Sequence, residues 1–305
     1  MNKYPNPDDL RVFMTVARNA SFVRAADEMG VSSAYVTKRL RILEATIGTR
    51  LLHRTTRVVS LTDSGEIVYE QAQRILGSLD KLVEEADPKA HEPRGYMRIC
   101  SSFGFGRNLV APAISRLVGR YPQLEIRFEV LDRVVDPAVE GFDLDVRVGD
   151  EIAPHLIARH LADNYRVLCA SPEYLRANGE PKMLSDLAQH NCLVIKERDH
   201  PFGTWELPSG GKLEPVKVSG NLSTNHGEVA VRWAIDGFGI LLRSIWDVGP
   251  MLDNGELVRV LPAFRQDANV WAVYPAESKQ SAKIRVCVEF LRGYFDEFVA
   301  RSPTD

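Results

Sequence analysis

Cysteine is scarce in this sequence of 305 residues, which contains four. The four lie far apart, and none belongs to a Cys-x-x-Cys pair: Cys100, Cys169, Cys192 and Cys287. Their neighbours are apolar, so we expect buried free thiols of a protein in the reducing cytoplasm rather than a disulfide framework. The alternative is a redox-sensing Cys100, because the polar pair Ser101-Ser102 follows it.

Long apolar runs and the common catalytic or cofactor motifs are also missing. Residues 1–10 are polar, so they lack the apolar core of a signal peptide, and no window reaches the apolar length of a membrane span. Neither GxGxxG nor GxxxxGKS/T occurs, and the histidines form no HExxH. His155 and His160 lack the i, i+4 spacing and a third ligand. The sequence therefore predicts no membrane segment, no cofactor, no metal site and no catalytic residue.

The composition is that of a soluble globular protein, with 45% hydrophobic and 26% charged residues. The length suggests two domains. Charge is distributed unevenly along the chain, because residues 1–62 hold ten Lys and Arg against five Asp and Glu, a formal +5 that leaves −8 for the rest. The basic N-terminal part is therefore the candidate for binding a polyanion such as nucleic acid.

Three amphipathic helices are predicted in the first fifty residues. The first two have apolar residues at helical spacing, and Gly30 provides the tight turn that follows them. Ser32 is the expected N-cap of the third helix. The inward-facing residues of the three helices are Leu10, Phe13, Val16 and Ala17, then Phe22, Ala25, Ala26 and Met29, then Val36, Leu40 and Leu43.

The outer face of the third helix is small, polar and basic, which is typical of a recognition helix in the DNA major groove. The β-branched, basic stretch 51–61 predicts a hairpin wing that presents arginines to phosphates or to the minor groove. Together they predict a winged helix-turn-helix over residues 1–62, although a solvated basic face is the alternative for any one helix. The expected DNA-binding residues are Ser32, Ser33, Ala34, Tyr35, Thr37, Lys38, Arg41, Arg54, Thr55 and Arg57.

A long helix is predicted over residues 63–87, with apolar residues spaced 4, 3, 4, 3 and 4 apart. This narrow stripe is typical of a coiled-coil seam, and the same helix of a second chain is the simplest partner. Packing on the chain's own C-terminal part is the alternative. The expected dimerisation residues are Val68, Ala72, Ile75, Leu79 and Leu82. A homodimer of this kind would read an imperfect inverted repeat in double-stranded DNA.

Residues 88–95 are polar and contain two prolines, so they predict a hinge before a second domain, 96–305. In that domain strands alternate with helices, which predicts an α/β fold, and the βαβαβ order of residues 97–148 predicts a largely parallel sheet there. The expected strands are 97–100, 125–130, 144–148, 167–170, 192–195, 216–218, 240–242 and 270–274, and the expected helices are 108–118, 135–140, 173–177, 228–236 and 282–299.

Residues 21–65 resemble the LysR-type transcriptional regulators, through Ala25-Ala26, the turn Gly30-Val31-Ser32 and the wing Arg54-Thr55-Thr56 among others. Tyr35 departs from the smaller residue usual there. Later stretches are similar to the subgroup that controls tartrate and malate utilisation genes: 101–107, 142–151, 192–199, 244–248 and 271–278. The resemblance implies a two-lobed, periplasmic-binding-protein-like effector domain (lobe one 96–163 and 269–305, lobe two 164–268), with the ligand between the lobes. It also implies pairing of dimers into a homotetramer, and RNA polymerase as a further partner.

The expected effector-binding residues lie at strand ends and polar turns, where open α/β sheets bind ligands. In residues 101–107, hydroxyls, glycines and a following helix predict an anion cradle. Arg147 could pair with a ligand carboxylate or, equally, with Asp143 or Asp145. The full set is Ser101, Ser102, Phe103, Arg107, Asp132, Arg147, Lys196, Phe202, Thr204, Thr224 and Asn225.

These observations predict a DNA-binding transcription regulator whose effector is a small organic acid, a hydroxy-dicarboxylate such as tartrate or malate. Two alternatives from other classes are a small-molecule binding protein and an α/β enzyme acting on an organic acid. Adjacent charged pairs such as Asp132-Arg133 do not by themselves make an acid-base site.

Overall fold

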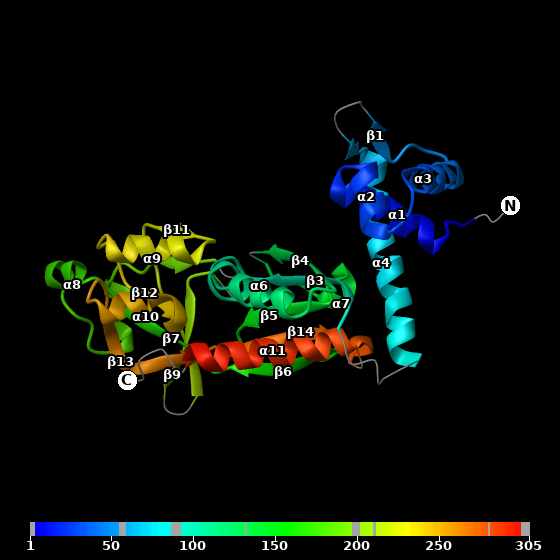
Figure 1. Cartoon of the computed structure of the whole chain (residues 1–305). Coiled ribbons are helices and arrows are strands. Elements are labelled where there is room, and N and C mark those ends of the chain that lie inside the picture. Colours follow the sequence, from blue (N-terminus) through cyan, green and yellow to red (C-terminus); the bar gives the residue numbers. More distant parts are fainter. Residues whose placement is uncertain are drawn as a thin grey trace. The chain divides into compact units, whose positions relative to one another are not determined.

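The computed structural model describes residues 4–54, 59–86, 93–131, 133–196, 202–209, 212–279 and 281–299 (Figure 1). The chain divides into two compact units, residues 1–90 and 91–305, and each is described by itself. Within the described residues, no helix combines the length and the apolar character that crossing a membrane requires.

The N-terminal unit contains the three predicted helices, α1 (Pro7–Asn19), α2 (Phe22–Met29) and α3 (Ser33–Ile47). A side-chain oxygen caps the start of each one, from Asn6, Ser21 and Ser32 in turn. Two of the helices end at glycines with positive φ, Gly30 (+64°) and Gly48 (+84°), so the chain can turn sharply without strain. The inward faces of the three helices meet in one apolar core.

The wing is an antiparallel pair of short strands, β1 (Leu52–Arg54) and β2 (Val59–Leu61), and residues 55–58 between them lie outside the described part. The long helix α4 (Asp63–Ala86) follows directly. Its first turn touches the wing so closely that a Cβ added to Gly65 would lie 2.0 Å from the carbonyl oxygen of Leu51. Only glycine fits at this joint.

The second unit begins with a five-stranded sheet in the order β4-β3-β5-β14-β6, which we call lobe one. Its first three strands are parallel, whereas β14 runs antiparallel to both of its neighbours. Helix α11 packs along β6, and α6 covers β4 (Figure 1). The strands are β3 (Gly95–Ser101), β4 (Leu124–Val130), β5 (Leu144–Val148), β6 (Leu156–Ala162) and β14 (Val270–Pro275); the helices are α5 (Phe103–Phe105), a π-helix (Gly106–Val110), α6 (Ala111–Arg120), α7 (Pro137–Glu140), a 3-10 turn (Ala276–Ser278) and α11 (Ala282–Val299).

The chain between β6 and β14 forms the rest of the second unit, which we call lobe two. Its three-stranded sheet, β12-β7-β13, is antiparallel, and β8 pairs in parallel with β11. The strands are β7 (Tyr165–Ala170), β8 (Val194–Ile195), β9 (Thr204–Ser209), β10 (Lys212–Lys217), β11 (Ser223–Thr224), β12 (Leu241–Ser244) and β13 (Val258–Asp267). The helices are α8 (Pro172–Asn178), a 3-10 segment (Leu184–Gln189), α9 (Gly227–Ile235) and α10 (Ile245–Asp253).

The α/β class is as predicted, and the parallel pairing expected for residues 97–148 is confirmed, although β14 and β6 add antiparallel strands to the same sheet. The parallel pairing holds for β4-β3-β5, where a helix crosses over between consecutive strands. In lobe two, β12 and β13 pair with the two edges of β7 and both run antiparallel to it, while α10 connects β12 to β13.

Candidate nucleic-acid interface and effector site

The outer face of α3 brings most of the predicted DNA-binding side chains together. A shallow, open hollow along the helix is lined by Ser33, Ala34, Thr37, Lys38, Arg41 and Ile42. Ser33, Ala34, Lys38 and Arg41 are exposed to solvent. A strip of small residues bordered by two cations can approach the floor of a groove closely and reach phosphates at its rim.

Two hydroxyls on this face are engaged by the helix itself. The Ser32 hydroxyl accepts a hydrogen bond from the Tyr35 backbone N–H at 3.2 Å, so it serves as the N-cap. The Thr37 hydroxyl donates to the Ser33 carbonyl at 2.8 Å, so its proton is already engaged within the helix. Tyr35 is exposed at the start of the helix. Arg54 ends strand β1, and Thr55 and Arg57 lie outside the described residues.

The inner face of α3 is fixed by both packing and charge. Val36, Leu40 and Leu43 are fully buried, and the Arg39 guanidinium forms an ion pair with buried Asp9 of α1 at 2.5 Å. Burial raises the pKa of Asp9, and the Arg39 charge opposes this effect without cancelling it. Sequence reasoning missed this pair, because Asp9 and Arg39 are thirty residues apart and no local pattern links them.

The linker helix α4 uses part of its predicted seam within its own unit, which corrects the dimerisation prediction. Ala72 is only 1% exposed in the single chain, and Val68 and Leu79 pack against the N-terminal core. These three contact the chain's own winged helix-turn-helix, an alternative that the sequence reasoning did not weigh. Ile75 and Leu82 remain on the surface, with 48% and 62% of each residue exposed.

At the carboxyl end of β3 the predicted anion cradle is divided between structural and accessible groups. Ser101 is buried, and its hydroxyl donates to the Val146 carbonyl at 2.6 Å, so it holds β3 to β5. Ser102 and Phe103 are partly exposed at the start of α5. Gly106 follows, where an added Cβ would lie 2.8 Å from a methyl group of Val130. This close approach lets the π-helix pack directly on the sheet.

The π-helix and α5 of lobe one meet α9 of lobe two. The rings of Phe103 and His226 stack, with centroids 5.3 Å apart and planes inclined by 21°. Glu228 accepts hydrogen bonds from the Arg107 guanidinium and, at 3.0 Å, from the Asn108 amide. The structure therefore places predicted residues Phe103 and Arg107 beside two lobe-two groups that the sequence reasoning missed.

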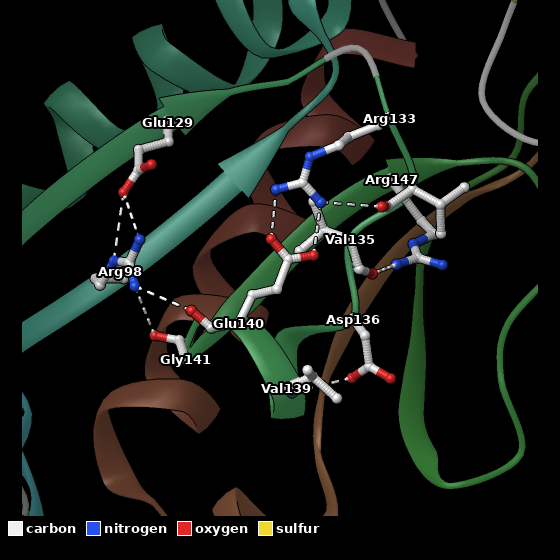
Figure 2. A network of polar contacts seen from close by, with 10 residues as sticks. Arg98, Glu129, Arg133, Val135, Asp136, Val139, Glu140, Gly141 and Arg147 are labelled. Carbon is white, nitrogen blue, oxygen red and sulfur yellow. Dashed lines mark hydrogen bonds and ion pairs between the residues drawn. The ribbon is translucent and has the colours of Figure 1, made fainter.

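Arg147, by contrast, is an internal residue, so the ion-pair alternative describes it and its effector-binding role is corrected. It is buried, and its guanidinium forms an ion pair with Asp145 at 2.6 Å and donates to the Val135 carbonyl at 2.7 Å. Residues i and i+2 of a strand share one face, so Asp145 lies within reach. Figure 2 shows this guanidinium directed at Val135.

The same region is braced by further ion pairs around the segment 133–142 (Figure 2). The Arg98 guanidinium binds the Glu129 carboxylate at 2.8 Å and the backbone carbonyls that end α7. Arg133 binds Glu140 through both nitrogens, which lowers the pKa of that carboxyl. Asp136 caps α7. These charged groups pair with one another, so they stabilise the loop beside the sheet rather than bind a ligand. The predicted effector-binding residue Asp132 lies outside the described part.

On lobe two the structure brings Lys196 beside Thr224, because the Lys196 N–H donates to the Thr224 carbonyl at 2.7 Å. The Thr224 hydroxyl accepts from the His226 N–H at 3.0 Å. Asn225 lies between them and is exposed. These residues follow the ends of the parallel strands β8 and β11, as expected.

A hollow of lobe two lies near this edge and contains Thr204, with Arg166, Ile195 and Gln266 among its other lining residues. The Arg166 guanidinium donates to the Gln266 side-chain oxygen at 3.1 Å. Phe202 is mostly exposed. Arg166 was missed, because its pairing with Gln266 depends on a bulge that shifts the register of β13.

Cysteine and metal chemistry find little support in the described residues. All four thiols are buried, and burial raises the pKa of Cys169, Cys192 and Cys287 to about 12. Across the same described ranges, no three His, Cys, Asp or Glu side chains are grouped so that they could hold a metal ion.

Both units of the chain match known protein families. Residues 7–66 match the family "Bacterial regulatory helix-turn-helix protein, lysR family", and residues 90–296 match the "LysR substrate binding domain". The chain is 56% identical over 297 residues to the HTH-type transcriptional regulator DmlR of Escherichia coli strain K12, which covers 97% of each chain. It is 47% identical over 294 residues to the HTH-type transcriptional activator TtdR of the same strain, which covers 96% of this chain and 95% of that one.

Solved structures of full length are similar as well. CrgA, a LysR-type transcriptional regulator from Neisseria meningitidis, has a TM-score of 0.58 and 29% identity, and the match covers 95% of this chain and 99% of that chain. The Vibrio cholerae virulence activator AphB has a TM-score of 0.56 and 26% identity, over 95% and 99% of the two chains.

Proposed function

The chain belongs to the LysR family of DNA-binding transcription regulators, and on that premise we propose that it binds an inverted-repeat operator as a homodimer and responds to a small hydroxy-dicarboxylate. The family and the named relatives are regulators, not enzymes, so the α/β-enzyme alternative is set aside. The open, cationic face of α3 is the observation that supports the DNA-binding part of this proposal.

DNA contact is tested by removing a cation from that face. Lys38→Ala should weaken binding to a duplex from the promoter next to the regulator's own gene. If Lys38 contacts a base, the substitution should cost about 1–3 kcal/mol of binding free energy. If it contacts a phosphate, the slope of log affinity against log salt concentration should fall by about one. Arg176→Ala is the matched control, because it removes one exposed cation from α8 in the other unit. Equal affinities of Lys38→Ala and wild type, in anisotropy titrations at two salt concentrations, would contradict the α3 interface.

The effector class rests on the resemblance to the tartrate and malate subgroup and on the polar groups at the facing strand ends. Hydroxyls at Ser102 and Thr224 and the cation of Arg107 suit an acid that carries both carboxylates and hydroxyls. Isothermal calorimetry with D-malate, L-malate, both tartrates and succinate tests the class. No heat of binding with any of them would eliminate dicarboxylates as effectors.

Effector binding can change DNA binding only if the acid favours one arrangement of the subunits over another. We expect dimers to pair into a tetramer and the acid to shift how the paired DNA-binding units are placed. Sedimentation velocity with and without the acid, followed by footprinting of the operator, measures both. A footprint and a sedimentation coefficient that are both unchanged at saturating acid would contradict this coupling.

A further inference from the structure

Glu228 places a carboxylate of lobe two on two donors of lobe one. One carboxylate oxygen accepts from the Arg107 guanidinium, and the other accepts from the Asn108 amide at 3.0 Å. Arg107 and Asn108 are consecutive residues of the π-helix, and such helices are frequent at functional sites. Together they form a two-point receptor for one carboxylate, and the chain's own carboxylate occupies it.

A second guanidinium, that of Arg243, lies near this receptor. A Cβ added to Gly104 would lie 3.5 Å from both the Glu228 carboxylate and the Arg243 guanidinium, so these two groups share one neighbourhood. Arg243 is buried and is held by Asp247 at 2.5 Å. It lies directly against Gly227, where any side chain would overlap the guanidinium. The Glu228 carboxylate therefore lies near a second guanidinium, which Asp247 holds in place and whose charge Asp247 balances.

The contact is also exchangeable. Arg107 has 64% of its side chain exposed and Glu228 has 23%, so water and salt compete mainly for the arginine, and ion pairs open to solvent contribute little. A ligand that brings its own carboxylate to Arg107 and Asn108 faces a weak competitor. The competitor is tethered in lobe two, so its displacement breaks a contact between the lobes.

From this geometry we propose that Arg107 and Asn108 bind a carboxylate of the effector, and that Glu228 occupies this site until the effector displaces it. The proposal rests on the proposed function and adds to it the carboxylate-binding pair and the internal competitor. It also identifies which contact between the lobes is given up when the acid binds.

The test is a double-mutant cycle measured by calorimetry with tartrate and D-malate. Glu228→Gln removes the competing charge and should tighten binding about two- to fivefold, the range expected for an exposed ion pair. Arg107→Met should weaken binding. In the double variant the gain in affinity from Glu228→Gln should vanish, because the Arg107 guanidinium for which Glu228 and the ligand compete is absent. A weaker or unchanged affinity of Glu228→Gln, or strictly additive effects, would overturn the proposal.

The matched control is Glu173→Gln, because Glu173 also lies in the first turn of a lobe-two helix and is exposed. Its affinity should equal that of wild type, which separates competition from a change in helix-terminal charge. A gain equal to that of Glu228→Gln would refute direct competition.

A second readout needs no effector, so it keeps the two proposals distinguishable. Hydrogen exchange in the free protein should quicken at 103–110 and at 226–235 in Glu228→Gln, but not in Glu173→Gln. If no dicarboxylate binds the wild-type protein but hydrogen exchange quickens in Glu228→Gln, the proposed effector class is wrong, whereas the role of Glu228 in joining the lobes is supported. Unchanged exchange in both segments would overturn the role of Glu228 whatever the acid does.

Discussion

The surface of the linker helix offers the sharpest test of assembly. Ile75 and Leu82 lie seven residues apart, so they share one face of α4, and both remain exposed in the single chain. Val68, Ala72 and Leu79 face the chain's own core instead. A substitution at Ile75 or Leu82 therefore probes association between chains, whereas one at Ala72 would also damage the fold.

The expected magnitude follows from the exposed fraction. Complete burial of an Ile or Leu side chain stabilises by about 1.5–3 kcal/mol, so covering a half-exposed one contributes roughly 1 kcal/mol. A two-fold symmetric dimer contains Ile75 twice, once in each chain. Ile75→Lys should therefore cost roughly 2 kcal/mol of association free energy and raise the dimer dissociation constant about 30-fold. Like charges brought together across the axis add to this loss.

Sedimentation velocity over a dilution series measures the dissociation constant directly. Gly77→Lys is the control, because an added side chain there meets no atom within 4 Å and points away from Ile75 around the helix. It should leave the dimer intact, whereas Ile75→Lys should shift the midpoint to higher concentration. If Ile75→Lys and wild type dissociate at the same concentration, α4 is not the dimer contact.

Three further predictions concern stability and reactivity. Gly65→Ala should destabilise the N-terminal unit by about 1–3 kcal/mol in thermal unfolding, because the new methyl group would overlap the Leu51 carbonyl, while Gly77→Ala should stabilise by about 0.5–1 kcal/mol. The raised pKa of Asp9 means that this group binds more protons in the folded than in the unfolded chain just above pH 3.8, so Asp9 contributes a negative slope to the free energy of unfolding as pH rises there. Urea titrations of Asp9→Asn should lack this slope. Thiol reagents at pH 8 should modify Cys169, Cys192 and Cys287 only after denaturation, and rapid labelling of the native protein would contradict their burial.

Elements with a strong local pattern could be predicted almost to the residue. Helix α11 and strand β5 have the expected bounds, and the winged helix-turn-helix follows the apolar spacing of its helices. Strands β6, β9, β11 and β13 and helix α10 were missed. Strand β13 contains a bulge between Val260 and Arg265 that interrupts its alternation, which explains why its pattern was weak.

The functional residues could be predicted only in part, because only some of them depend on a local pattern in the sequence. The face of α3 is a property of one helix, so its spacing determined which residues point outward. The spacing of α4 indicates a narrow apolar stripe, but it does not distinguish the chain's own core from a second chain. Arg147 had two possible partners in sequence, and its burial with Asp145 required the tertiary structure.

The contacts between lobe one and lobe two are of two kinds, and the difference bears on how a ligand could act. Trp246 of α10 packs edge-on against Phe105, with ring centroids 5.3 Å apart, and joins the lobe-one core. Glu228 binds Arg107 at the surface instead. A contact held by apolar packing resists a small polar ligand, whereas an exposed ion pair exchanges with one. Displacement of Glu228 would therefore leave the lobes joined at Trp246 and at the stacked rings of Phe103 and His226, so we expect a rotation of the lobes rather than a separation.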